Sequence, residues 1–277
     1  MIGYWFDKDR LRNLADLHRD EFARGEPFQH VMIDDFLEPD ALEPILAEFP
    51  SPEEPDWFRR DNEHEIKLSL SETARMGPAT RALLAELNGQ VFVDFLERLT
   101  GIEGLIPDPH LLGGGLHQIR RGGYLKVHAD FNRHPRLNLD RRLNVLIYLN
   151  KDWLDEWGGH FELWDREVTV TRKRILPIFN RFVVFATTDY SNHGHPDPLN
   201  CPPERARRSI ALYYYTNGRP ADEESSRHST VFRGRPGEVL RSSGFRQFVF
   251  RWTPPAVMQR VDEVRTRRAL GSDRRQH

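Results

Sequence analysis

Hydrophobic positions in the first hundred residues recur mainly at helical spacing. Segments 14–23 (LADLHRDEFA) and 79–99 (ATRALLAELNGQVFVDFLERL) carry apolar residues at helical spacing, which predicts two helices, the second of them core-facing. Between them, 30–37 (HVMIDDFL) reads as a strand, and 38–49 contains Pro39 and Asp40, which favour the start of a helix. We therefore predict an N-terminal helical support, residues 1–109, that contains one strand near 30–37.

The pattern changes at about residue 110. Short apolar runs with many β-branched and aromatic residues alternate with glycine- and proline-rich turns as far as residue 216. The runs are LHQI, YLKVHAD, LNVLIYLN, HFELWD, REVTVT, FVVFATT and SIALYYYT. Many short strands at this spacing favour an antiparallel sandwich or barrel, so we predict a mainly β fold with flanking helices.

Residues 217–277 are polar and form a C-terminal extension. The segment contains a candidate strand, FRQFVF, and a basic end, VDEVRTRRALGSDRRQH, which we expect to be a flexible, solvated tail. The sequence shows no repeat or low-complexity block that would separate further modules. We therefore expect residues 1–277 to form a single domain.

Composition and charge limit the partners and the kinds of metal site that the protein can have. The chain of 277 residues has 40 Lys plus Arg against 42 Asp plus Glu, so nothing indicates a nucleic-acid partner. No apolar run approaches the roughly 18 residues of a membrane span, and the N-terminus lacks a secretory pattern, which predicts a cytoplasmic protein without a membrane partner. One cysteine, Cys201, excludes an internal disulfide and cysteine-rich zinc sites. With 12 histidines, a bound metal must have nitrogen and oxygen ligands.

Two segments supply such ligands. His128 and Asp130 are two apart in the predicted strand YLKVHAD, so their side chains share a face. The apolar run FVVFA, residues 182–186, is followed by His193 and His195. Two histidines and a carboxylate are the facial triad of non-haem Fe(II) oxygenases, which leaves positions open for O2 and an organic acid.

A third segment offers an anion clamp. Arg207 and Ser209 are also two apart, in the last predicted core strand. A guanidinium beside a hydroxyl suits the remote carboxylate of a dicarboxylic co-substrate.

In these motifs the sequence resembles the Fe(II)- and 2-oxoglutarate-dependent oxygenases of the prolyl-4-hydroxylase-like group. The segment RRLNVLIYLNKDWLDEWGGHFELWD is similar to the same region of the hypoxia-inducible-factor prolyl hydroxylases. The resemblance implies a double-stranded β-helix (jelly-roll, cupin-like) core. It also implies Fe(II), 2-oxoglutarate and O2, with ascorbate as a candidate reductant.

The resemblance also assigns residues. His128, Asp130 and His193 would hold iron; Arg207, Ser209 and Tyr148 would bind the far carboxylate of 2-oxoglutarate. Phe161 would line the co-substrate pocket and Tyr213 would lie near iron, although these two and Tyr148 are also compatible with an ordinary aromatic core. Four further residues are candidates for the substrate side: His117, Asn132, His134 and His195.

The distal ligand needs a choice between two histidines. The family places it after a Ser-aromatic pair and three residues before proline. His193 fits, with Ser191 before it and Pro196 after it, although Asn192 stands where an aromatic residue is commoner. We assign His193, and His195 remains the alternative.

The resemblance implies a dioxygenase that hydroxylates an unactivated C–H bond and releases succinate and CO2. We favour a small-molecule or carrier-bound substrate; a peptidyl prolyl substrate is the alternative. A cupin-like metal-binding isomerase, or a non-catalytic module, is the more remote alternative, because neither needs the Arg207 and Ser209 clamp. The sequence indicates no oligomeric state.

Overall fold

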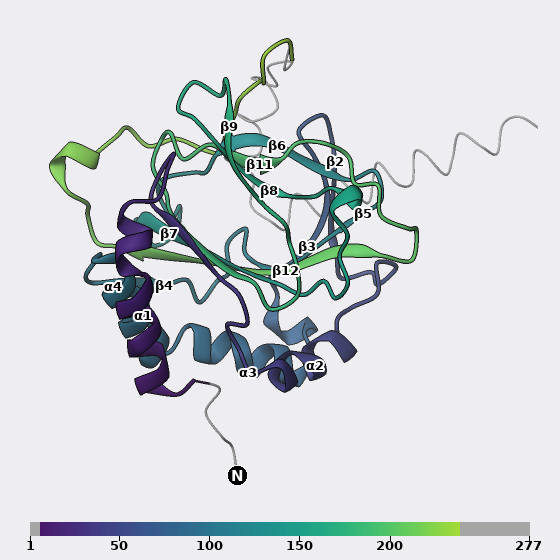
Figure 1. Cartoon of the computed structure of the whole chain (residues 1–277), viewed down its shortest axis with the longest axis horizontal. Coiled ribbons are helices and arrows are strands. Elements are labelled where there is room, and N and C mark those ends of the chain that lie inside the picture. Colours follow the sequence, from purple (N-terminus) through teal and green to yellow (C-terminus); the bar gives the residue numbers. More distant parts are fainter. Residues whose placement is uncertain (1–5, 239–277) are drawn as a thin grey trace, which may run out of the picture. The chain divides into compact units, whose positions relative to one another are not determined.

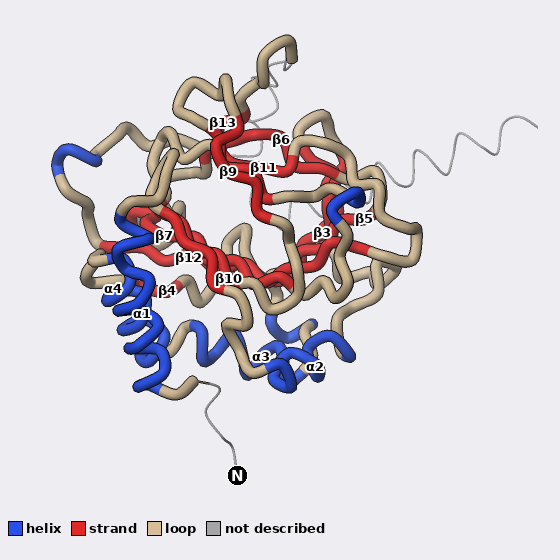
Figure 2. The backbone as a smooth tube through the Cα atoms, in the orientation of Figure 1, coloured by secondary structure: helices blue, strands red, loops and turns tan. Residues whose placement is uncertain are grey.

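A computed structural model describes residues 6–238, in which antiparallel strands form one strongly curled sheet (Figures 1 and 2). Hydrogen-bonded neighbours follow the order β1-β10-β7-β12-β5-β3-β6-β11-β8-β9. In that order the strands are His30–Ile33, Phe182–Ala186, Asp140–Tyr148, Ala206–Thr216, Gly115–Arg120, Glu65–Leu70, Tyr124–Ala129, His193–His195, Phe161–Trp164 and Thr171–Ile175. Three short strands attach to this path: β2 (Phe58–Asp61) to β3, β4 (Ile106–Pro107) to β12, and β13 (Val231–Phe232) to β6.

The sheet curls until its two ends face each other. Phe185 of β10 packs against Phe161 of β8, with ring centroids 5.2 Å apart, although six strands separate β10 and β8 in the order above. Ile175 of β9 joins the same buried cluster. Two facing half-sheets with alternating inward side chains are a double-stranded β-helix, so the predicted fold class is confirmed.

Helices α1 (Lys8–Ala23), α2 (Pro39–Ala47), α3 (Pro78–Leu87) and α4 (Gln90–Thr100) gather below the half-sheet of β10, β7 and β12 (Figure 2). Aromatic side chains form the contact: Phe36, in the loop before α2, stacks on Phe182 at 4.3 Å, and Phe92 of α4 meets Tyr214 at 6.1 Å. Short 3-10 turns occur at Thr73–Arg75, Asp155–Trp157 and Ala221–Glu223. The helices bury the outer apolar face of this half-sheet and leave its inner face for the site.

The prediction of one helix over 79–99 was wrong. α3 ends at Leu87 and α4 begins at Gln90, because Asn88 caps one helix and Gly89, with φ of −83° and ψ of 164°, starts the next. Neither Asn nor Gly favours a helix interior, so the chain breaks where they meet. α4 then ends at Gly101 in the left-handed region.

The strand predicted for REVTVT was also mostly wrong. Residues 166–170 form turns, and β9 begins only at Thr171. The Asp165 carboxylate accepts hydrogen bonds from the backbone N–H groups of Thr169 and Val170, which closes the turn before the strand. The hairpin of β2 and β3 was not predicted at all, because its outer strand, FRRD, is polar and exposed.

The C-terminal extension is described only in part. FRQFVF and the basic tail lie outside the described residues, and the expectation of a single domain stays a prediction. Among the helices of residues 6–238, none is long and apolar enough to span a bilayer.

Candidate active site

The sheet register brings His128, Asp130 and His193 together on the inner face. β11 pairs with β6 so that His193 lies directly opposite His128, and Asp130 follows the end of β6. Nε2 of His128 lies 3.6 Å from Asp130 Oδ1, and Nε2 of His193 lies 3.5 Å from Oδ2. Within residues 6–238 these three are the one group whose donor atoms lie close enough to share a metal ion.

Backbone carbonyls fix the two imidazoles. Nδ1 of His128 donates to the Lys126 carbonyl and Nδ1 of His193 donates to the Ser191 carbonyl, both at 2.9 Å. The proton therefore sits on Nδ1 in each ring, and Nε2 presents its lone pair toward Asp130. Two imidazoles and a carboxylate form a nitrogen and oxygen donor set that fits Fe(II).

Gly194 allows β11 to approach β6. A Cβ on Gly194 would lie 2.8 Å from the Leu125 carbonyl oxygen and 3.0 Å from that of Lys126. Any side chain would push His193 away from His128. Burial, and then the neighbouring His128, lowers the pKa of His193 to about 3, which keeps its ring neutral at physiological pH.

Asp130 is held by two side chains that sequence analysis missed. Arg141 Nη2 donates to Oδ2 at 3.0 Å and Asn144 Nδ2 donates to the same oxygen at 2.7 Å. Burial alone would raise the pKa of Asp130, but Arg141 and the two histidines hold it well below its usual range. Arg141 is 1% exposed and lies between aromatic rings, with its Cζ 3.5 Å from the Tyr213 centroid and 4.5 Å from that of Phe131.

Arg207 lies on the same inner face, 5% exposed. Its Nε donates to the Gly159 carbonyl at 2.8 Å and its Nη2 donates to the Tyr148 hydroxyl at 3.1 Å. No carboxylate of the described residues neutralises this guanidinium, and burial lowers its pKa. A buried cation without a counter-ion is costly unless an anion joins it, so the geometry fits a bound carboxylate.

The other predicted co-substrate residues surround this point. Ser209 lies opposite both Tyr148 on β7 and His117 on β5, and its side chain is buried. Phe161 packs against His193 with centroids 5.4 Å apart. Tyr213 covers Arg141 and donates from its hydroxyl to the Gly113 carbonyl at 2.8 Å.

The four substrate candidates separate into two pairs. His195 is buried with neither ring nitrogen paired among residues 6–238, and His117 lies on the same inner face. Asn132 is instead bonded to the segment after the 3-10 turn Ala221–Glu223, through Ser225, Ser226 and His228. His134 is fully buried against Tyr215 and accepts from backbone N–H groups of its own loop, so the structure does not bring it to the triad.

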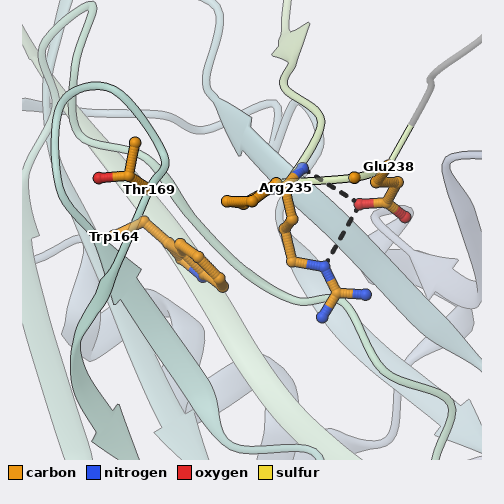
Figure 3. A pocket seen from close by; sticks show the side chains of 6 residues that line it. Trp164, Thr169, Arg235 and Glu238 are labelled. Atoms are coloured by element: carbon orange, nitrogen blue, oxygen red, sulfur yellow. Dashed lines mark hydrogen bonds and ion pairs between the residues drawn. The ribbon is translucent and has the colours of Figure 1, made fainter.

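A separate hollow lies at Trp164, the last residue of β8 (Figure 3). Its lining includes Trp164, Thr169, Arg235 and Glu238, and Trp164 packs outward with Val127. Arg235 bonds to Glu238 at 3.3 Å. Because alternate side chains of β8 point to opposite faces, Trp164 faces away from the triad while Leu163 faces inward.

Comparisons with known proteins agree with this geometry. Residues 114–215 match the family model of the 2OG-Fe(II) oxygenase superfamily. This range contains the triad and Arg207. No curated protein sequence matches the chain.

Three solved structures share the fold. A prolyl hydroxylase from Trichoplax adhaerens, in complex with a hypoxia-inducible-factor peptide fragment, has 18% identity and a TM-score of 0.54, covering 75% of this chain and 91% of that one. A Pseudomonas putida prolyl-4-hydroxylase has 16% identity and a TM-score of 0.51, covering 74% and 100%. A Phytophthora capsici prolyl 4-hydroxylase has 19% identity and a TM-score of 0.53, covering 78% and 67%.

The matched family, the fold and the donor set point to the same cofactors, Fe(II), 2-oxoglutarate and O2. Over residues 114–215 the chain therefore matches the 2OG-Fe(II) oxygenase superfamily, and its fold is the one that the solved prolyl hydroxylases share.

Proposed function

We propose that the protein hydroxylates an unactivated C–H bond of a small molecule or carrier-bound metabolite, with release of succinate and CO2. The observation that carries the proposal is Arg207, a buried guanidinium on the face that holds the triad, which has no carboxylate partner among residues 6–238. His128, Asp130 and His193 would hold the iron, which supplies the oxidising chemistry once 2-oxoglutarate and O2 have bound.

The chain's own residues bind and orient the reactants. Arg207 and the Tyr148 hydroxyl would receive the far carboxylate of 2-oxoglutarate, and Ser209 would supply a further hydroxyl beside them. Arg141 and Asn144 hold the Asp130 carboxylate in place. Phe161 and Phe185 pack against His193 and exclude water from that side.

The surroundings of the triad support a substrate of limited size. Phe232 of β13 lies opposite His128, with ring centroids 5.5 Å apart, and stacks on His64 at 4.4 Å. The β2 and β3 hairpin borders the inner face along the same edge of β6, nearer to Tyr124. Residues from both the N-terminal support and the C-terminal extension therefore border the substrate side.

A peptidyl prolyl substrate is the second candidate. It is favoured by the solved structures of similar fold, one of which holds a peptide fragment. The two candidate substrate classes are distinguished by which compounds stimulate succinate formation in the same assay.

The test is succinate formation from 2-oxoglutarate under Fe(II), with panels of metabolites and of proline-containing peptides. Stimulation by metabolites alone supports the proposal, and stimulation by peptides alone supports the second candidate.

Arg207→Met is expected to abolish 2-oxoglutarate binding, measured by calorimetry on the anaerobic Mn(II) form. Arg205→Met, on an arginine whose Cζ lies over Trp157 instead, is the matched control. Undiminished 2-oxoglutarate affinity in Arg207→Met would contradict the proposed site.

A further inference from the structure

A second charged cluster lies on the inner face, on the hairpin that the sequence did not reveal. Glu65 and Lys67 of β3 are two apart, and the register places Arg60 of β2 directly opposite Lys67. Glu65 accepts from Arg60 at 3.0 Å and contacts Lys67 at 3.1 Å. The side chains of Glu65 and Lys67 are 9% and 13% exposed, and that of Arg60 is 41% exposed.

Register shows that this cluster faces the active site. Leu125 of β6 pairs with Glu65 on one side and with His195 on the other. Glu65 is therefore two strands from His195, roughly 10 Å across the sheet at the usual strand spacing. His195 in turn is two residues from His193 on the same strand face.

Lys67 also lies close to the predicted co-substrate residues. Ser69, two residues further along β3, is opposite His117, and His117 is opposite Ser209. β3, which carries Glu65 and Lys67, therefore lies between two strands of the site. On one side is β5, whose His117 is opposite Ser209, and on the other is β6, which carries His128 of the triad. Burial first, and then Lys67, lowers the pKa of His117 to about 3, as expected where positive charge is concentrated.

Charge is unbalanced around this space. Six charged side chains from β2, β3, β7, β12 and the residue after β6 face this space: Arg60, Glu65, Lys67, Asp130, Arg141 and Arg207. Four cations face two carboxylates. Fe(II) and doubly charged 2-oxoglutarate cancel each other, so an excess of two positive charges remains when both are bound. Among residues 6–238, Glu65 is the one carboxylate that pairs with Arg60 and Lys67, so within this part of the chain both cations keep further N–H donors.

We propose that the substrate carries an anionic oxygen group, a carboxylate or a phosphate, that is bound by Lys67 and Arg60. The inference rests on the proposed function and narrows its substrate class to acids. The cluster lies roughly 10 Å across the sheet from His195, which is two residues from the metal ligand His193. That separation suits a small acid whose anionic end binds Lys67 and Arg60 and whose other end reaches the metal. Exposed Phe58 lies beside Arg60, with the Arg60 Cζ 4.9 Å from its ring centroid, so the cluster is reachable from solvent.

The test uses simple anions as probes. The Mn(II) form, loaded with 2-oxoglutarate, is titrated with inorganic phosphate and with 13C-labelled acetate. The paramagnetic relaxation of each nucleus is measured by NMR. Relaxation that saturates, and weakens at least 10-fold in affinity in Lys67→Met, is the expected result; the stronger of the two probes identifies the group. Lys173→Met, on an exposed lysine of β9, is the matched control.

Two further variants separate anion binding from a structural role. Glu65→Gln frees both cations and is expected to tighten anion binding, whereas a lost structural contact would weaken it. Lys67→Arg is expected to retain binding. Equal affinity in the wild type and Lys67→Met, or no saturable relaxation in the wild type, would overturn the inference. A wild-type protein that fails to bind 2-oxoglutarate would contradict the proposed function instead, and the anion titration of the Mn(II) form would still report on Lys67.

Discussion

Arg141 donates its 3.0 Å hydrogen bond to the same oxygen of Asp130 that faces Nε2 of His193. Asn144 donates to that oxygen as well, and Arg141 Nε donates to the Asn144 side-chain oxygen at 2.8 Å. The three side chains form a closed set of hydrogen bonds. The carboxylate plane is therefore fixed, and Oδ1 remains turned toward His128.

Arg141→Met is expected to lower metal affinity about 10- to 100-fold, because partners that orient a metal ligand typically contribute that much. Binding of Mn(II) or Co(II), followed by calorimetry, measures the effect. Arg142→Met is the matched control, since Arg142 bonds instead to Thr216 and Glu223. Equal losses of metal affinity in both variants would show that Arg141 affects metal binding only through the stability of the fold.

Tyr148→Phe tests the contact with Arg207. The variant keeps the ring under the guanidinium but removes the hydroxyl that Arg207 contacts at 3.1 Å. A hydrogen bond to a charged group contributes about 1.5–3 kcal/mol, so 2-oxoglutarate affinity should fall roughly 10- to 100-fold. Tyr190→Phe, on a tyrosine that is 39% exposed, should leave that affinity unchanged. Unaltered binding in Tyr148→Phe would remove Tyr148 from the proposed co-substrate site.

The three triad residues could be predicted because each lies in or directly after a strand that the sequence pattern already indicates. The spacing of His128 and Asp130 needs only one strand, and His193 follows a strand that is apolar throughout. Arg141 and Asn144 were missed because their contact with Asp130 depends on how β7 is placed against the end of β6. β12 shifts register between Tyr214 and Tyr215, which brings Arg141 opposite Tyr215 on the inner side. No spacing in the sequence reports such a shift.

The β2 and β3 hairpin was missed for a related reason. β3 reads EIKLSL, and its inward positions are Glu65, Lys67 and Ser69, so the polar face points into the barrel and the apolar face points outward. A pattern of alternation predicts a strand but normally assigns its polar face to solvent. The inversion is what makes these residues candidates for a substrate site.

Phe182→Ala tests how far the helices stabilise the sheet. Phe182 is fully buried and contacts Phe36, Phe92 and Phe95. Loss of a buried phenylalanine costs about 3–5 kcal/mol through lost burial and the cavity that remains. The free energy of unfolding in urea measures this, and Phe58→Ala, on a phenylalanine that is 60% exposed, should cost far less. Similar losses in both variants would contradict the packing described for β10.

His117 makes stability depend on pH. Burial, and then Lys67, Arg207 and Arg60, lower its pKa to about 3, from an ordinary value of 6.5. Between these values the unfolded chain binds a proton that the folded chain does not, so stability is complete above pH 6.5 and falls as the pH drops toward 3. The slope from this one group is at most about 1.4 kcal/mol per pH unit. His117→Gln removes the proton and should flatten the dependence of unfolding free energy on pH by up to that amount. Urea denaturation of metal-free wild type and variant from pH 7.5 downward provides the measurement, with the difference at pH 7.5 as the baseline. Parallel curves would show that His117 does not titrate on unfolding in this range.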